Sequence, residues 1–273
     1  MACTDSDIVF AKLDPGARSF YQRAMRTMND AGGPFLVGGA YAFGCYTGIE
    51  RHTKDLDLFL PVRLMDRAKQ VLEDSGYRTE LAHPHWLAKV FEGENFVDLI
   101  FASGNGVSFV DETWFTKSVE DELLGVPVRL VAPEEIIWMK AFIMERERFD
   151  GADVAHLIRD RGETMDWEHL LHLFGPHWRV LYCHVILFGY IYPSRLDSIP
   201  SWVLDELAER LSREESHPIA EEVCRGTLLS RAQFLSDIEE RGLKDARRWP
   251  HGQMSGEEIA SWTSKIDSEE AAI

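Results

Sequence analysis

Two aspartates separated by one residue, Asp55 and Asp57, are the first candidates for chemistry in this 273-residue chain. They lie in the segment DLDLFL (55–60), where polar and apolar residues alternate as they do in a β-strand. Residues i and i+2 of a strand point to the same face, so both carboxylates project together. Two neighbouring carboxylates repel each other unless a cation lies between them, and oxygen ligands suit Mg²⁺ or Mn²⁺. The pair therefore predicts a divalent-metal site.

A third acid, Asp98, lies inside an otherwise apolar strand candidate, NFVDLIFA (95–102). A carboxylate in such a strand is costly to bury unless it binds a metal ion, a proton donor or a cationic partner. A third acid beside the first pair completes a two-metal site, which clamps the attacking and leaving oxygens of a phosphoryl transfer. We therefore predict that Asp55, Asp57 and Asp98 are both the metal ligands and the catalytic residues.

A pair of glycines, Gly38 and Gly39, precedes these acids. It lies at the junction of a short apolar run, FLV (35–37), and a helical segment that ends at Gly48. Because glycine has no Cβ, such a turn lets backbone N–H groups and the start of the helix approach an anionic phosphate. The glycine pair is therefore predicted to bind the phosphates of a nucleotide.

The elements that must position these residues follow from the hydrophobic periodicity. Residues 14–31 and 63–77 have the apolar spacing of helices, and residues 78–102 have the texture of strands. Strand and helix alternate along the first part of the chain before further strands follow. This order predicts an α+β (α/β-like) fold with a small mixed β-sheet flanked by helices.

The second part of the chain, from Ala132 onward, is predicted to be helical. Pro133 and the acidic pair that follows it suit the first turn of a helix. Helical texture continues over residues 136–162, as one or two helices, and over residues 167–215. We therefore predict two domains. Residues 1–131 form a catalytic domain that includes an N-terminal helix, and residues 132–273 form a helical domain that ends in a loosely attached polar tail (244–273).

The segment LVGGAYAFGCYTGIERHTKDLDLFL (36–60) resembles the signature of the DNA polymerase β-like nucleotidyltransferases, in which a Gly-Gly turn opens a helix and D-x-D follows on the next strand. A further acid on a nearby strand of that family maps onto Asp98, whereas the Ser that commonly follows the glycines is Ala40 here. The resemblance implies a small mixed sheet with flanking helices, followed by a helical domain. It also implies transfer of a nucleoside monophosphate (NMP) from a nucleoside triphosphate (NTP) to a hydroxyl, with release of pyrophosphate.

Basic residues and a threonine precede the acidic pair. In bacterial members of this superfamily, basic residues and a Thr or Ser frequently precede D-x-D. This pattern is matched here by Arg51, Thr53 and Lys54. The match implies that Arg51 and Thr53 contribute to nucleotide binding. Arg51 and Lys54 are equally well explained as solvated loop charges.

A second resemblance lies in the helical half. Lys140, followed by Asp150 and Asp153, resembles the K…R…D-x-x-D pattern of the abortive-infection toxin branch of the superfamily. In that branch the lysine contacts the nucleotide phosphates and a downstream aspartate is required. The resemblance implies nucleotide-binding roles for these residues and leaves the choice between the two aspartates open. Lys140 as a plain exposed helix lysine is an alternative.

Composition narrows the partners. The chain has 46 acidic and 29 basic residues, for a net charge of −17. Such a surface repels phosphate backbones, so a small molecule or a protein hydroxyl is predicted as the acceptor rather than a nucleic acid. The N-terminal segment lacks the pattern of a signal peptide, and the most apolar stretch (180–192) is too short to span a bilayer. We therefore predict a cytoplasmic protein with no membrane partner.

Two alternative functions remain at this stage. One is a toxin-type transferase that acts on a tRNA end, which requires a basic channel despite the overall negative charge. The other is a catalytically silent nucleotide-binding module that acts through a partner. Retention of all three acids argues against the silent module, because a protein without catalytic activity does not need a metal cluster.

Overall fold

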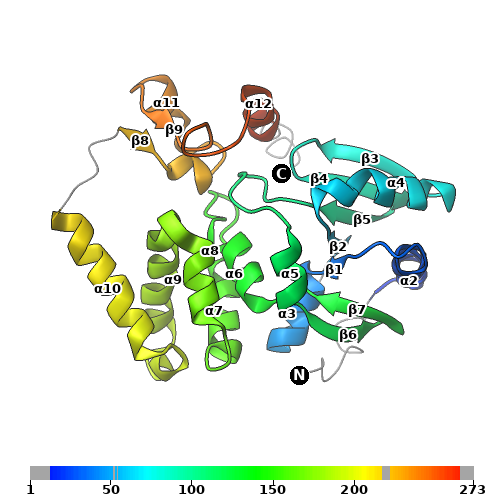
Figure 1. The fold of residues 1–273 in the computed structure, drawn as a ribbon, viewed down its shortest axis with the longest axis horizontal. Coiled ribbons are helices and arrows are strands. Elements are labelled where there is room, and N and C mark those ends of the chain that lie inside the picture. Colours follow the sequence, from blue (N-terminus) through cyan, green and yellow to red (C-terminus); the bar gives the residue numbers. More distant parts are fainter. Residues whose placement is uncertain (1–12, 52, 54, 217–221, 265–273) are drawn as a thin grey trace. The chain divides into compact units, whose positions relative to one another are not determined.

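The computed structural model describes residues 13–51, 53, 55–216 and 222–264. The chain divides into two compact units, the first ending at Ala132 and the second beginning at Pro133 (Figure 1). Both units bury apolar side chains of their own. The glycine pair and the three acids all belong to the first unit.

A mixed sheet runs through the first unit, and its described strands lie in the order β3-β4-β5-β2-β1-β7-β6. β2 pairs with β5, and β1 with β7, in parallel, whereas the other neighbouring pairs are antiparallel. This arrangement confirms the predicted mixed sheet. The strands are β1 (Leu36–Val37), β2 (Asp55–Phe59), β3 (Arg78–His83), β4 (Leu87–Glu92), β5 (Asn95–Ile100), β6 (Val119–Leu123) and β7 (Val126–Leu130).

Helices flank this sheet, as the sequence predicts. The first, α2 (Pro15–Asp30), begins where the Asp14 carboxylate accepts hydrogen bonds from the first free backbone N–H groups, and its apolar face packs on β5 and β7. α3 (Gly39–Thr47) packs on β2 and ends at Gly48, whose φ of 66° is left-handed. α4 (Met65–Asp74), after a 3₁₀ turn (Val62–Leu64), packs on β3. α5 (Glu112–Lys117) follows β5.

The β6–β7 hairpin is not among the elements that the sequence predicts. Its first strand carries three consecutive acids, Glu120, Asp121 and Glu122. β6 lies at the edge of the sheet, where one face meets solvent. The charged residues therefore conceal the alternation from which strands are recognised.

The second unit is helical. α6 to α9 pack on one another, and α10 packs on α9 (Figure 1). Its helices are α6 (Pro133–Ala141), α7 (Gly151–Arg161), α8 (Trp167–Phe174), α9 (Trp178–Ile191), α10 (Ser201–Ser216), α11 (Leu235–Glu239) and α12 (Gly256–Ser264). Three 3₁₀ turns (Gly175–His177, Leu196–Ser198, Gly226–Leu228) and the short parallel strands β8 (Val223–Cys224) and β9 (Lys244–Asp245) complete it. Among the described residues, no helix has the length and apolar character that a membrane span requires.

The prediction of a loosely attached polar tail is wrong for residues 244–264. Asp245 and Arg247 are 7% and 1% exposed, and their ion pair has an N–O distance of 2.7 Å. Met254 and Ile259 are also buried. Asp245 and Arg247 neutralise each other inside the fold, so a polar sequence can contain buried charges.

Candidate active site

The structure brings the three predicted acids together. β2 and β5 are parallel neighbours in the sheet, and their register pairs Asp57 directly with Asp98. One carboxylate oxygen from each of Asp55, Asp57 and Asp98 lies within 4.8 Å of the other two. Asp98 is buried, whereas the other two are half-buried. We call these three residues the acidic triad.

The donor set of the acidic triad fits a divalent cation. Mg²⁺ takes oxygen ligands at about 2.1 Å in octahedral geometry, so ligands on opposite sides of the ion lie about 4.2 Å apart. The oxygens of the acidic triad lie within 4.8 Å of one another, a comparable distance. The oxygen-only chemistry and the spacing therefore agree with the predicted Mg²⁺ or Mn²⁺.

Asp98 has a basic partner that the sequence analysis missed. Lys89 on β4 lies opposite Asp98, and its Nζ donates a hydrogen bond of 2.7 Å to Oδ1 of Asp98. Burial raises the pKa of the Asp98 carboxyl, and the charge of Asp55 raises it further, whereas the hydrogen bond and the charge of Lys89 lower it. The net shift is upward. Lys89 thus only partly offsets the cost of burying this acid.

A signal for Lys89 was present in the sequence. β4 and β5 form a hairpin with a two-residue turn at Gly93–Glu94, in which Glu92 pairs with Asn95. Counting outward from such a turn places Lys89 opposite Asp98. The turn could have been recognised from its glycine, and the register follows from it.

The glycine pair packs directly against β2. Gly39 has a φ of +55°, and a Cβ on it would lie 1.7 Å from Oδ2 of Asp57. A Cβ on Gly38 would lie 2.3 Å from the Phe59 ring, and its N–H donates a 3.0 Å hydrogen bond to the Asp57 carbonyl. The need for glycine at position 39 therefore arises from the Asp57 carboxylate and from the left-handed backbone. Contact between this turn and a triphosphate stays a prediction.

The residues before β2 differ in their contacts. The Thr53 hydroxyl donates a short hydrogen bond to Oδ1 of Asp55 and so orients that carboxylate. Arg51 is exposed, and its guanidinium carbon lies 5.4 Å from the centre of the Phe43 ring on α3. Lys54 lies outside the described residues. Among these three residues, Thr53 is therefore the one whose described hydrogen bond reaches the acidic triad, at Asp55.

Two buried tyrosines have pKa values that the charge of the acidic triad helps to raise. The rings of Tyr21 on α2 and Tyr41 on α3 meet edge to face, with centroids 6.5 Å apart. Burial raises the pKa of both phenols, and the negative charges of Asp55 and Asp57 raise it further. Both phenols therefore stay protonated at neutral pH. Their position was not predicted from the sequence.

In the second unit, the structure brings Lys140 together with both aspartates of the D-x-x-D pattern. Nζ of Lys140 lies 2.7 Å from Oδ2 of Asp150 and 2.8 Å from Oδ2 of Asp153. Arg148 also donates two hydrogen bonds of 2.8 Å to Asp150. Burial by itself would raise the pKa of Asp150, but the hydrogen bonds from Arg148 and the charge of Lys140 outweigh it and lower the pKa. Lys140 is therefore neutralised by carboxylates, and its contact with phosphates stays a prediction.

Replacing Lys140 by Met is expected to lower the free energy of unfolding at pH 7 by about 2 kcal/mol, because it removes the cation between the Asp150 and Asp153 carboxylates while Arg148 still pairs with Asp150. A carboxyl with a lowered pKa stabilises the fold above its unfolded-state pKa, near 3.9, and less as the pH falls through its folded-state value. The difference between Lys140→Met and the wild type should therefore be constant from pH 5 to 8 and shrink below about pH 4. Urea unfolding across this range measures it.

The conservative variant Lys140→Arg is the control, because it keeps the positive charge between Asp150 and Asp153. It should lose much less stability than Lys140→Met. Equal stability of the wild type and Lys140→Met at pH 7 would contradict the structural role of this ion pair.

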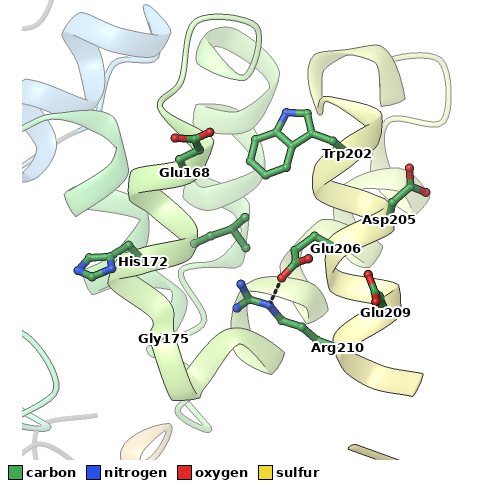
Figure 2. A pocket seen from close by; sticks show the side chains of 9 residues that line it. Glu168, His172, Gly175, Trp202, Asp205, Glu206, Glu209 and Arg210 are labelled. Carbon is green, nitrogen blue, oxygen red and sulfur yellow. Dashed lines mark hydrogen bonds and ion pairs between the residues drawn. The ribbon is translucent and has the colours of Figure 1, made fainter. Parts of the chain in front are cut away.

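The second unit also contains a groove of about 810 Å³ between α8 and α10 (Figure 2). Trp202 and His172 are among the residues that line it. Arg210 donates a 2.7 Å hydrogen bond to Glu206 within α10. The acids that line the groove are Glu168, Asp205, Glu206 and Glu209. Because these acids outnumber the single arginine, the charge of the groove disfavours phosphate groups.

Comparison with known proteins identifies a family match over more than half of the chain. The model of a family described as "Nucleotidyl transferase of unknown function (DUF2204)" matches residues 17–170. This range contains the glycine pair, the acidic triad and Lys140. A search of curated proteins found no match to this chain.

Several solved structures are similar to this chain. The solution structure of the antibiotic-resistance factor ANT(2'')-Ia has 17% identity, covers 63% of this chain and 98% of that one, and gives a TM-score of 0.45. Lincomycin-bound LnuA, a lincosamide antibiotic adenylyltransferase, has 15% identity, coverages of 51% and 94%, and a TM-score of 0.37. An antigenic nucleotidyltransferase-like protein from Paracoccidioides brasiliensis has 14% identity, coverages of 67% and 93%, and a TM-score of 0.41. All three TM-scores are low, so these likenesses by themselves assign no activity.

Proposed function

Because this chain belongs to the nucleotidyl transferase family whose model matches residues 17–170, we propose that it transfers an NMP from an NTP to an acceptor hydroxyl in a reaction that depends on Mg²⁺ or Mn²⁺. The observation that carries the proposal is the acidic triad, three carboxylates gathered on adjacent strands inside the family-matched region. Phosphoryl transfer depends mainly on positioning and charge neutralisation, so it needs no nucleophile from the protein.

The residues of the acidic triad have separate roles in this proposal. Asp55 and Asp57 would hold the cation that neutralises the phosphate oxygens of the NTP, and Asp98 would hold a second one. Thr53 keeps the Asp55 carboxylate oriented. The acceptor oxygen forms a bond to the α-phosphorus, the bond from that phosphorus to pyrophosphate breaks, and the hydroxyl proton passes to Asp98. Asp98 is a carboxylate and so can accept this proton.

The phosphates are proposed to lie at the start of α3. Gly38 and Gly39 form the turn that begins this helix, where backbone N–H groups favour an anion. Arg51 is an exposed cation beside the same helix, against Phe43. The missing Cβ of Gly39 leaves room for the Asp57 carboxylate beside this turn.

The acceptor is proposed to be a small molecule or a protein hydroxyl. The net charge of −17 disfavours the approach of a long polyanion and favours an acceptor that carries positive charge. The four acids that line the α8–α10 groove also favour a positively charged acceptor over a polyanion. A tRNA acceptor would require a local basic channel strong enough to outweigh this field within a screening length of about 8–10 Å.

The proposed function is tested by incubating the purified chain with each α-labelled NTP and Mg²⁺ or Mn²⁺ in the presence of hydroxyl compounds, proteins or bulk tRNA. We expect mass spectrometry to find the mass and the label of one NMP on a small molecule or a protein, and the amount of unlabelled pyrophosphate released to match it. If the label appears on tRNA, and tRNA binds tightly with an affinity that falls steeply as salt is added, the acceptor is tRNA, as in the toxin-type transferases, and the proposed acceptor class is wrong. Absence of both transfer and NTP binding would contradict the proposed function.

A further inference from the structure

Lys89 has no role in the nucleotidyl transfer derived so far, yet it contacts the most buried acid of the site. It lies on β4, and the antiparallel register places it directly opposite Asp98 on β5. Its Nζ is 2.7 Å from Oδ1 of Asp98. The same carboxylate is therefore offered both to this ammonium group and to any cation bound by Asp98.

The ammonium group of Lys89 is held on two sides. Besides its bond to Asp98, Nζ lies 4.0 Å from the centre of the Phe96 ring, within the range of a cation–π interaction. The side chain of Lys89 is 25% exposed and that of Asp98 is 11% exposed. A pair this shielded from water interacts more strongly than a surface ion pair.

Charge counting shows what this contact does to the site. Three ionised carboxylates give the acidic triad a charge of −3, and the ammonium of Lys89 reduces the local charge to −2. The ammonium group and a divalent cation are both positive, and both are attracted to the Asp98 carboxylate. Lys89 and a cation at Asp98 therefore repel each other.

We propose that Lys89 is a positioning residue that holds the Asp98 carboxylate in the nucleotide-free protein and competes with a divalent cation for it. This inference rests on the proposed function, because it takes the acidic triad to be a metal site. It follows that the protein binds divalent cations weakly until the nucleotide arrives, since the NTP brings phosphate charge to the same site. Lys89 thus links occupancy of the metal site to the presence of substrate.

The test is a titration of Mn²⁺ without nucleotide, in which electron paramagnetic resonance counts the free ion at pH 8, where protons compete little for the carboxylates. Lys89→Met removes the charge and keeps most of the stem, and it should bind Mn²⁺ about tenfold more tightly than the wild type. Lys89→Arg keeps the charge and should bind Mn²⁺ as the wild type does. Lys69→Met, on α4, makes the same charge change away from β4 and should also leave binding unchanged.

The outcomes separate this inference from the proposed function. If Asp57→Asn abolishes Mn²⁺ binding but Lys89→Met binds no more tightly than the wild type, the metal site stands and the competition by Lys89 is wrong. If Asp57→Asn binds Mn²⁺ as the wild type does, the metal site itself is wrong, and both proposals fall. Circular dichroism and thermal melting of each variant show that the comparison is between folded proteins.

Discussion

Asp57→Asn is expected to reduce NMP transfer by a factor on the order of 10³ while the fold stays intact. Asp57 lies between the other two acids of the triad, next to Asp55 along β2 and opposite Asp98 on β5. An amide has no negative charge and offers a single oxygen, so it is a much poorer ligand for a divalent cation. Transfer measured with the NTP and acceptor found for the wild type tests this expectation.

The stability of Asp57→Asn gives a second measure of the same site. Three neighbouring carboxylates repel one another, so removing one charge should leave the melting temperature unchanged or raise it when no metal is present. Added Mg²⁺ should then stabilise the wild type but not the variant, because a ligand that binds only the folded protein raises its apparent stability. Glu94→Gln makes the same change at an exposed acid in the β4–β5 turn and should behave as the wild type. Full activity in Asp57→Asn would remove the acidic triad from the mechanism.

The acidic triad shows what local patterns predict well. The alternation in DLDLFL and the isolated acid in NFVDLIFA predicted two strands, with two carboxylates on one face of the first and a third acid in the second. The pattern could not predict that β5 returns to lie parallel to β2, because β3 and β4 intervene along the chain. Adjacency of strands that are distant in sequence is decided by how the helices and the sheet pack together.

Partners of charged residues were harder to predict than the residues themselves. Lys140, Asp150 and Asp153 were selected together from a pattern, but their mutual ion pairs depend on how α6 and α7 pack. Asp245 and Arg247 looked like part of a solvated tail because hydropathy is assigned to each residue singly. Mutual neutralisation is a property of pairs in space, so a scan of single residues underestimates burial wherever opposite charges meet.

Gly39→Ala is expected to reduce NMP transfer on the order of 100-fold, because a Cβ at this position would lie 1.7 Å from Oδ2 of Asp57 and must displace that carboxylate. The left-handed backbone adds a cost of about 1–2 kcal/mol in stability, since Gly39 has a φ of +55°. Gly48 is a matched control in the same region of the chain. It ends α3 with a φ of +66°, and a Cβ there would meet no atom within 4 Å.

Gly48→Ala should therefore lose only the stability that the left-handed backbone costs, about 1–2 kcal/mol, and keep its transfer activity. Mn²⁺ titration then tells why Gly39→Ala fails. If the displaced Asp57 carboxylate is the cause, Mn²⁺ binding weakens even without nucleotide. If Mn²⁺ binding is unchanged and only NTP affinity falls, the glycine is needed for a phosphate rather than for Asp57. Equal activity losses in the two variants would show that backbone strain alone accounts for the effect, and the steric argument at Gly39 would then be wrong.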